Sequence, residues 1–214
     1  TAGWLAAVPE IEHVDVVEIE PAIIDAARAF AAVNHRVHDN PKVRMIVGDA
    51  REVLLAAGGE QYDLIVSEPS NPYRAGVASL FTVDFYRNVQ GRLREGGLFL
   101  QWVQGYEIDV KTLRTVYATY LSVFPEVTTW QTQAGDLLLV GSQRATTIQG
   151  EAMRARIAAE PYRSALQHAW RVDDLEGVIA HYVCGTQTAR KLAAGAQLNT
   201  DDRTVIEFGF ARTV

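Results

Sequence analysis

The stretch YDLIVSEPSNPY, residues 62–73, decides the fold. It begins with a nearly continuous apolar run, which is typical of a strand in a parallel sheet covered on both faces. Ser67 and Glu68 end the run, and Pro69 and Pro72 then keep the chain out of a helix, because proline lacks a backbone N–H and restricts the preceding residue. We interpret the stretch as a buried strand that delivers a carboxylate into an open loop. An ordinary junction between strand and loop is the simpler alternative.

Outward from this stretch, strand-like and helix-like segments alternate along the chain. The predicted strands are 13–20, 43–49, 62–68, 98–103, 127–133 and 136–142, and the predicted helices are 1–8, 21–35, 50–58, 82–97 and 109–125. Pro21 and Thr82 mark helix starts, and Gly96-Gly97 marks a helix end. Residues 150–195 have a mainly helical pattern, and Ala134-Gly135 favours an antiparallel hairpin.

Strands that alternate with helices predict right-handed crossovers and a mostly parallel sheet, so we expect a doubly wound α/β domain. Ligands of such folds bind beyond the carboxyl ends of the strands. The polar residues at those ends are therefore the candidate site residues, and they are Glu18, Asp49, Glu68 and Gln101.

Two of these carboxylates have a nucleotide-binding interpretation and a simpler one. Glu18 ends the strand at which such folds usually bind the two ribose hydroxyls, but it also suits a solvated strand end. Asp49 precedes a predicted helix and is an ordinary N-cap residue there. In the functional interpretation, its carboxylate or the backbone N–H of Ala50 forms a hydrogen bond with the edge of an adenine base.

Composition excludes several classes of function. The chain has 214 residues, a net charge of −6 and 48% hydrophobic content, so it can bury a full core but has no basic surface for nucleic acid. Cys184 is the single cysteine, which rules out an intrachain disulfide and a multi-thiolate metal site, and the histidines show no ligand spacing. No apolar stretch is long enough to span a bilayer. We expect a cytoplasmic location, no metal and no nucleic-acid partner.

Three segments carry a family resemblance: VDVVEIEPAIIDAAR (14–28), VGDAREVLLAAGGEQYDLIVSEPSNPY (47–73) and LFLQWVQ (98–104). With GDLLLVG and LNTDDR further on, they resemble the spermidine synthase (polyamine aminopropyltransferase) family, and above all its bacterial domains that are often fused to membrane segments. The resemblance covers residues 1–143. It implies a Rossmann-like class I methyltransferase-type sheet with a terminal antiparallel hairpin, and a mainly helical extension, 144–214, packed on it. It also implies that the first strand and its Gly-rich loop precede Thr1.

The resemblance assigns roles to the residues of the nucleotide half of the site. Glu18 corresponds to the family's ribose-binding glutamate, and Asp49 and Ala50 correspond to its adenine-binding pair. The implied co-substrate is decarboxylated S-adenosylmethionine, or S-adenosylmethionine itself.

The resemblance also assigns an amine half. Glu68 stands where the family has the catalytic aspartate that receives the attacking amine, and Asn71 stands where a second aspartate is usual. Gln101 matches a glutamine near the substrate amine, and Tyr73 is a candidate for the wall of the crevice. A carboxylate suits this place because the amine must lose a proton before it attacks the carbon beside a sulfonium. Because Asn71 is neutral, we expect weaker binding of a diamine than in the family.

The leading hypothesis is therefore a transferase that moves an aminopropyl group from decarboxylated S-adenosylmethionine to an amine such as putrescine. A class I methyltransferase that acts on a small molecule is the first alternative, and a non-catalytic nucleotide-binding or regulatory module is the second. The expected partner is a small-molecule amine. The resemblance also admits a homodimer and a parent chain attached to a membrane.

Overall fold

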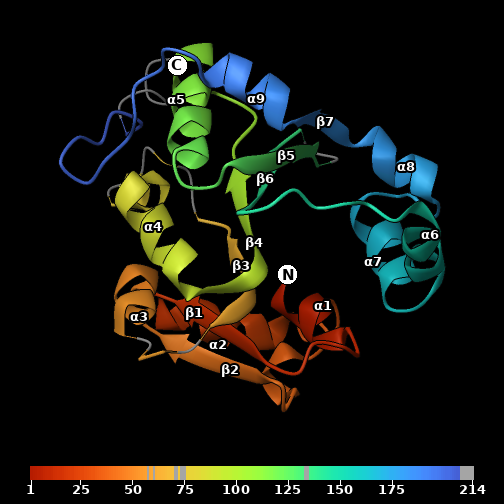
Figure 1. Cartoon of the computed structure of the whole chain (residues 1–214). Coiled ribbons are helices and arrows are strands. Elements are labelled where there is room, and N and C mark those ends of the chain that lie inside the picture. Colours follow the sequence, from red (N-terminus) through yellow and green to blue (C-terminus); the bar gives the residue numbers. More distant parts are fainter. Residues whose placement is uncertain (57, 60, 70–71, 73–75, 133–134, 208–214) are drawn as a thin grey trace. The chain divides into compact units, whose positions relative to one another are not determined.

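The computed structural model describes residues 1–56, 58–59, 61–69, 72, 76–132 and 135–207 (Figure 1). The chain divides into two compact units, and each is described by itself. Unit 1 comprises Thr1–Ala57 and Gln149–Val178, and unit 2 comprises Gly58–Ile148 and Ile179–Val214. Each unit thus takes residues from both sides of position 143, where the resemblance ends. In the described part of the chain, no helix is both long and apolar enough to cross a membrane.

Unit 1 is built on a short parallel sheet. Strands β1 (Val14–Glu18) and β2 (Val43–Val47) pair in parallel, from Val14 opposite Val43 to Glu18 opposite Val47. The helical elements are α1 (Ala2–Ala7), α2 (Pro21–Ala29), η1 (Val37–Asp39), α3 (Ala50–Ala56), α6 (Gly150–Ala158), α7 (Tyr162–Ala169) and the larger part of α8 (Leu175–Ala180).

Helix α2 begins where the sequence predicts and ends earlier. Glu20 caps it by accepting a hydrogen bond from the Ala22 backbone N–H at 3.0 Å, and Pro21 is its first residue. The predicted end at residue 35 is wrong, because the chain turns to pack on α1. The side chain of Asn34 donates to the Ala27 carbonyl at 2.7 Å, and the Asn34 carbonyl lies so close to Gly3 that a Cβ there would come within 1.8 Å of it.

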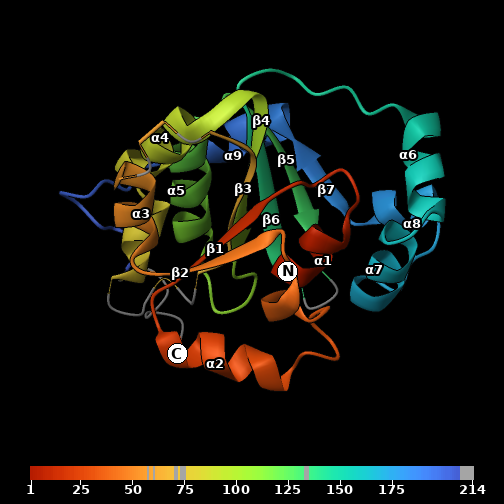
Figure 2. The same cartoon turned by 90° about the horizontal axis from the view of Figure 1, so that it is seen from below.

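Unit 2 contains a mixed sheet of five strands. Their order is β3 (Tyr62–Ser67), β4 (Leu93–Val103), β6 (Leu137–Ser142), β5 (Glu126–Gln131) and β7 (Tyr182–Gly185), which lie side by side in Figure 2. β3 and β4 are parallel, and the other pairs are antiparallel. This confirms the predicted Rossmann-like α/β architecture with its antiparallel hairpin. The prediction of a mostly parallel sheet is wrong for unit 2, where β6, β5 and β7 pair only in antiparallel fashion. β7 was not predicted, because four residues within a helical pattern give no strand signal.

The glycine pair after helix α4 (Val83–Arg92) has a different role from the predicted one. β4 begins at Leu93, so residues 93–97 belong to the strand and not to the end of a helix. The pairing of β3 with β4 shifts register between Tyr62 and Leu64, and Gly96 has a φ of +80°. A Cβ on Gly97 would meet the Arg94 carbonyl at 2.9 Å. The two glycines therefore accommodate an irregularity in the ladder, as glycine often does at bulges.

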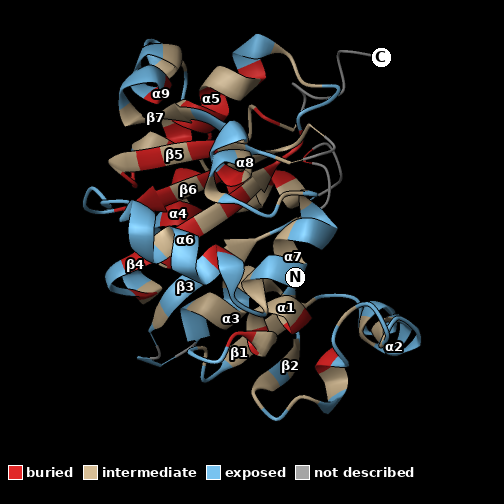
Figure 3. Ribbon diagram, turned by 90° about the vertical axis from the view of Figure 1, so that its right-hand side faces the viewer, coloured by how far each residue is buried: buried red, intermediate tan, exposed pale blue. Residues whose placement is uncertain are grey.

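An aromatic cluster joins the sheet of unit 2 to α4 and to α5 (Val110–Leu121). Phe99 of β4 stacks on Tyr120 of α5 with ring centroids 5.6 Å apart, and Tyr86 of α4 lies 5.3 Å from Tyr120. All three rings are fully buried, and the Tyr120 hydroxyl donates to the Phe99 carbonyl at 2.6 Å. Figure 3 shows buried residues concentrated on β4, β5, β6 and α5. Burial raises the pKa of Tyr86 and of Tyr120 above the usual value, so both remain neutral.

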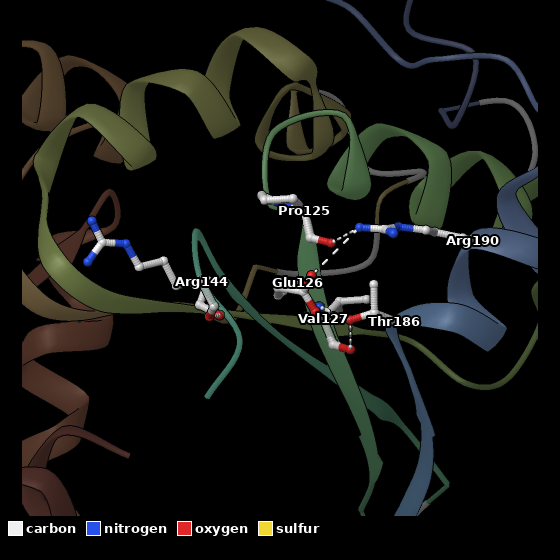
Figure 4. A network of polar contacts seen from close by, with 7 residues as sticks. Pro125, Glu126, Val127, Arg144, Thr186 and Arg190 are labelled. Atoms are coloured by element: carbon white, nitrogen blue, oxygen red, sulfur yellow. Dashed lines mark hydrogen bonds and ion pairs between the residues drawn. The ribbon is translucent and has the colours of Figure 1, made fainter. Parts of the chain in front are cut away.

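Helix α9 (Thr186–Ala193) is tied to the start of β5 by polar contacts, as Figure 4 shows. The Thr186 hydroxyl donates to Glu126 at 2.8 Å and accepts from the Val127 backbone N–H at 3.0 Å. Arg190 donates to the Pro125 carbonyl at 2.8 Å. On its other side, α9 lies beside α5, where Arg114 donates to the Leu192 carbonyl at 2.8 Å. These contacts fasten α9 to the sheet.

Substitution of Gly141 by alanine should destabilise unit 2. A Cβ on this residue of β6 would come within 2.5 Å of the Tyr120 ring and 2.9 Å of the Phe124 Cβ. Overpacking of this kind costs about 1–3 kcal/mol, which denaturant-induced unfolding would measure. Gly91→Ala is the matched control: it lies in α4 with open space around it, so it should be neutral or stabilising. Equal stability of the two variants would contradict the packing argument.

Candidate functional site

The carboxyl ends of β1 and β2 bring two predicted residues together in unit 1. Glu18 is the last residue of β1 and lies opposite Val47, and its carbonyl accepts a hydrogen bond from the Gly48 backbone N–H at 3.0 Å. Asp49 follows directly. Glu18 and Asp49 thus lie at the same end of this sheet, which we call the β1–β2 edge.

The Glu18 side chain is held in place by one hydrogen bond. Its Oε1 accepts from the Glu20 backbone N–H at 3.0 Å, and its Oε2 has no partner among the described residues. The residue is half-buried. A carboxylate fixed in this way has acceptor sites left for ligand hydroxyls. Glu20 itself is occupied with capping α2.

Asp49 acts as an N-cap of α3. Its Oδ1 accepts from the Arg51 backbone N–H at 2.7 Å, and its carbonyl accepts from the Val53 backbone N–H at 2.9 Å. This confirms the capping interpretation. Ala50 is the first residue of α3, so its backbone N–H has no helical carbonyl to donate to. It can therefore donate to another acceptor. The capping role leaves the adenine-binding role of Asp49 and Ala50 as a prediction.

In unit 2, the ends of β3 and β4 bring together Glu68 and Gln101. Ser67 pairs with Gln101 in the parallel ladder, and the Gln101 amide nitrogen lies 3.5 Å from the Ser67 carbonyl. Glu68 follows Ser67, is exposed, and makes no hydrogen bond or ion pair within the described residues. We call this end of the sheet the β3–β4 edge. It carries an exposed carboxylate, that of Glu68, and a buried amide, that of Gln101.

Two buried amide oxygens distinguish the β3–β4 edge. Gln101 and Gln104 are fully buried, and in the described part of the chain neither Oε1 has a hydrogen-bond partner. The amide nitrogen of Gln101 donates to the Trp102 carbonyl at 3.0 Å, and that of Gln104 donates to the Tyr106 carbonyl at 2.6 Å. Gln104 was not among the predicted site residues. The signal was available, since it is a polar residue directly past the carboxyl end of a buried strand.

The remaining predicted site residues, Asn71 and Tyr73, lie outside the described residues. No group of three or more His, Cys, Asp or Glu side chains that could hold a metal ion occurs among those that are described. The prediction that Glu18, Asp49, Glu68 and Gln101 face one common crevice spans both units, and it remains a prediction.

The LNTDDR motif anchors the segment that follows the β3 loop. Asn199 is fully buried, and its side-chain amide donates to the carbonyls of Ala78 and Phe81, at 3.2 and 3.0 Å, in helix η2 (Val77–Phe81). Its side-chain oxygen accepts from the Ile206 backbone N–H at 3.3 Å. Asp201 accepts from the Thr82 hydroxyl at 2.7 Å, at the start of α4. We call these contacts of Asn199 and Asp201 the Asn199 clasp.

Comparison with known proteins gives consistent matches. The model of the spermine/spermidine synthase domain matches residues 5–134. Putrescine N-methyltransferase 2 of Nicotiana attenuata is 28% identical over 116 residues, which are 54% of this chain and 31% of that protein. Polyamine aminopropyltransferase of Desulforudis audaxviator (strain MP104C) is 25% identical over 122 residues, which are 57% of this chain and 44% of that protein. The chain therefore spans less than half the length of these two relatives.

A solved structure gives the corresponding match in fold. The crystal structure of spermidine synthase from Thermotoga maritima superposes with a TM-score of 0.64 and 18% sequence identity. The superposition covers 87% of this chain and 62% of that chain. This likeness supports the Rossmann-like fold derived above.

Removal of the Asn199 side chain should destabilise η2, the helix that its amide contacts. Asn199→Ala removes the side-chain donor to the Ala78 and Phe81 carbonyls, which should lower the free energy of unfolding by about 2–3 kcal/mol. Amide hydrogen exchange should speed up in η2 above all. Asp202→Ala, an exposed change in the same motif, is the control and should stay within about 0.5 kcal/mol of the unchanged protein. Unchanged exchange in η2 would contradict an anchoring role.

Proposed function

Because the chain belongs to the spermine/spermidine synthase family, we propose that it transfers an alkyl group from an S-adenosylmethionine-type sulfonium to a small amine. In the specific form of the proposal, the donor is decarboxylated S-adenosylmethionine, the group is aminopropyl, and the acceptor is an amine such as putrescine. The β3–β4 edge carries the proposal: Glu68 is an exposed carboxylate at a strand end, directly after the residue whose carbonyl faces the Gln101 amide.

Glu68 is the proposed base of the reaction. An alkylammonium has no free electron pair, so the amine must first lose a proton, and a carboxylate within hydrogen-bond reach can accept it. The nitrogen then forms a bond to the carbon beside the sulfonium. The carbon–sulfur bond breaks with its electron pair going to sulfur, and a neutral thioether leaves. With the decarboxylated donor, that thioether is methylthioadenosine.

The β1–β2 edge is the proposed nucleotide site. The free oxygen of Glu18 suits the two hydroxyls of a ribose, since a charged acceptor makes strong hydrogen bonds to hydroxyl donors. An acidic group here also disfavours a ribose that carries a 2′-phosphate. Asp49 and the Ala50 backbone N–H offer an acceptor and a donor at the neighbouring strand end, which matches the needs of an adenine edge.

Methyl transfer to a small amine is the second candidate. The match to a protein named putrescine N-methyltransferase supports it as directly as the match to an aminopropyltransferase supports the first. Both reactions use an amine nucleophile and a sulfonium donor, and they differ in which carbon beside the sulfur is attacked. A non-catalytic nucleotide-binding module is the third candidate, and it requires nucleotide binding without turnover.

The choice of donor separates these candidates. The full-length protein is incubated with putrescine and either decarboxylated S-adenosylmethionine or S-adenosylmethionine, and the products are identified by mass spectrometry. We expect spermidine and methylthioadenosine with the first donor. N-methylputrescine with the second donor, and no spermidine with the first, would replace aminopropyl transfer by methyl transfer. Nucleotide binding without either product would favour the non-catalytic module.

Glu68→Gln should lower kcat by about 100-fold or more, because general acid–base catalysis typically contributes at least this factor. The measurement is steady-state turnover with saturating donor and amine. Asp63→Asn is the matched control: it removes one carboxylate from the other end of β3, where Asp63 is 79% exposed and pairs with Arg94. The control should keep full activity. A Glu68→Gln variant as active as this control would exclude Glu68 as the base.

Glu18→Ala should weaken methylthioadenosine binding about 10- to 100-fold, as expected for the loss of charge-assisted hydrogen bonds to a ribose. Isothermal titration calorimetry on the full-length protein measures the dissociation constant. Glu12→Ala, an exposed change shortly before the same strand, is the control for lost charge. Equal affinities for the two variants would refute the assignment of Glu18.

A further inference from the structure

The two amide side chains at the end of β4 have oxygens without a hydrogen-bond partner in the described part of the chain. Gln101 lies within the strand and Gln104 directly after it, and both side chains are fully buried. Within the described residues, neither Oε1 accepts a hydrogen bond. Buried polar atoms in native proteins nearly always have a partner, so two such acceptors at one strand end are available to the donors of a bound ligand.

The orientation of both amides is fixed by what surrounds their nitrogens. The Gln101 Nε2 faces the carbonyls of Ser67 and Trp102, and the Gln104 Nε2 faces the carbonyl of Tyr106. A flip of either amide would set its oxygen against a carbonyl oxygen, which is repulsive. The carbonyls therefore hold the NH2 groups, and each Oε1 is turned away from them as an acceptor.

An exposed turn fixes the position of the Gln104 side chain. Gly105, Tyr106 and Glu107 form a turn that is exposed, and the Gln104 amide is bound to this turn through the Tyr106 carbonyl. Gly105 is in turn bound to the hairpin between β5 and β6, where its backbone N–H donates to Asp136 at 3.1 Å. The turn therefore fixes the Gln104 amide from the side of its nitrogen.

We propose that Gln104 is a binding residue for the amine substrate, and that its Oε1 accepts an N–H of that amine alongside the Oε1 of Gln101. The inference rests on the proposed function, since it concerns the same site. Glu68 supplies the negative charge that attracts the ammonium, and the two neutral amides supply acceptors of fixed direction. The site therefore selects amines by their N–H groups as well as by their charge, which favours primary amines over fully alkylated ones.

Three variants of the full-length protein test the role of Gln104. Gln104→Leu removes the acceptor and should raise the KM for putrescine about tenfold, with kcat changed less than threefold and the KM for the nucleotide donor unchanged. A fully buried Gln104→Glu side chain favours the neutral acid, which can donate its O–H to the Tyr106 carbonyl and keeps an acceptor, so its KM for putrescine should stay near that of the unchanged protein. Gln143→Leu is the control, because this exposed amide also donates to a backbone carbonyl, that of Val123 at 2.9 Å.

The pattern across the variants decides the inference. If the KM for putrescine in Gln104→Leu stays within twofold of the control, or if Gln104→Glu is as impaired as Gln104→Leu, the role of Gln104 is structural and the inference is wrong. If an internal water were the only partner of the Gln104 Oε1, the KM for putrescine in Gln104→Leu would stay within twofold of the control.

Binding measurements separate this inference from the proposed function. Calorimetry compares putrescine with its counterpart in which both nitrogens are trimethylated, which has the same charge and no N–H. The unchanged protein should bind putrescine at least tenfold more tightly, and Gln104→Leu should reduce that ratio. If this holds without turnover with any sulfonium donor, the proposed function fails and the inference stands. If turnover occurs but the ratio is the same in Gln104→Leu, the inference alone fails. If putrescine does not bind at all, both fail.

Discussion

The register of β4 is the constraint on which unit 2 depends. Phe99, Gln101 and Val103 alternate with more exposed residues and lie on one buried face of the strand. Because side chains in a strand alternate between faces, a slip of one residue would remove Phe99 from the aromatic cluster and turn Gln101 to the other face. The packing of Phe99 against Tyr86 and Tyr120 therefore also determines where the Gln101 amide lies. Core packing and the geometry of the candidate site are set by the same register.

Much of this arrangement could be predicted because it follows from local patterns. The apolar run of β3 ends in Glu68, and the rule that parallel strands present their carboxyl ends to ligands selected Glu18, Asp49, Glu68 and Gln101 directly. The helix starts at Pro21 and Thr82 were also predicted correctly, since capping depends on only a few neighbouring residues.

The features that were missed depend on contacts distant in sequence. A glycine pair after a helical pattern usually marks the end of the helix, so Gly96 and Gly97 were predicted to end one. Their actual place, in an irregularity of β4, depends on the pairing of this strand with β3 near Tyr62. β7 exists because β5 offers it an edge, and the complete burial of the Gln104 side chain depends on the tertiary structure. Sequence patterns predict which polar residues lie at a strand end. Which of these side chains become buried depends on the tertiary structure.

The Asn199 clasp has a consequence for how the protein matures. The side chain that binds the η2 carbonyls belongs to a residue made more than a hundred positions after η2 itself. Domains fold as their parts leave the ribosome, amino-terminal parts first. The contacts of η2 are therefore completed only after Asn199 has left the ribosome, and the nascent protein cannot fix the segment after β3 before then.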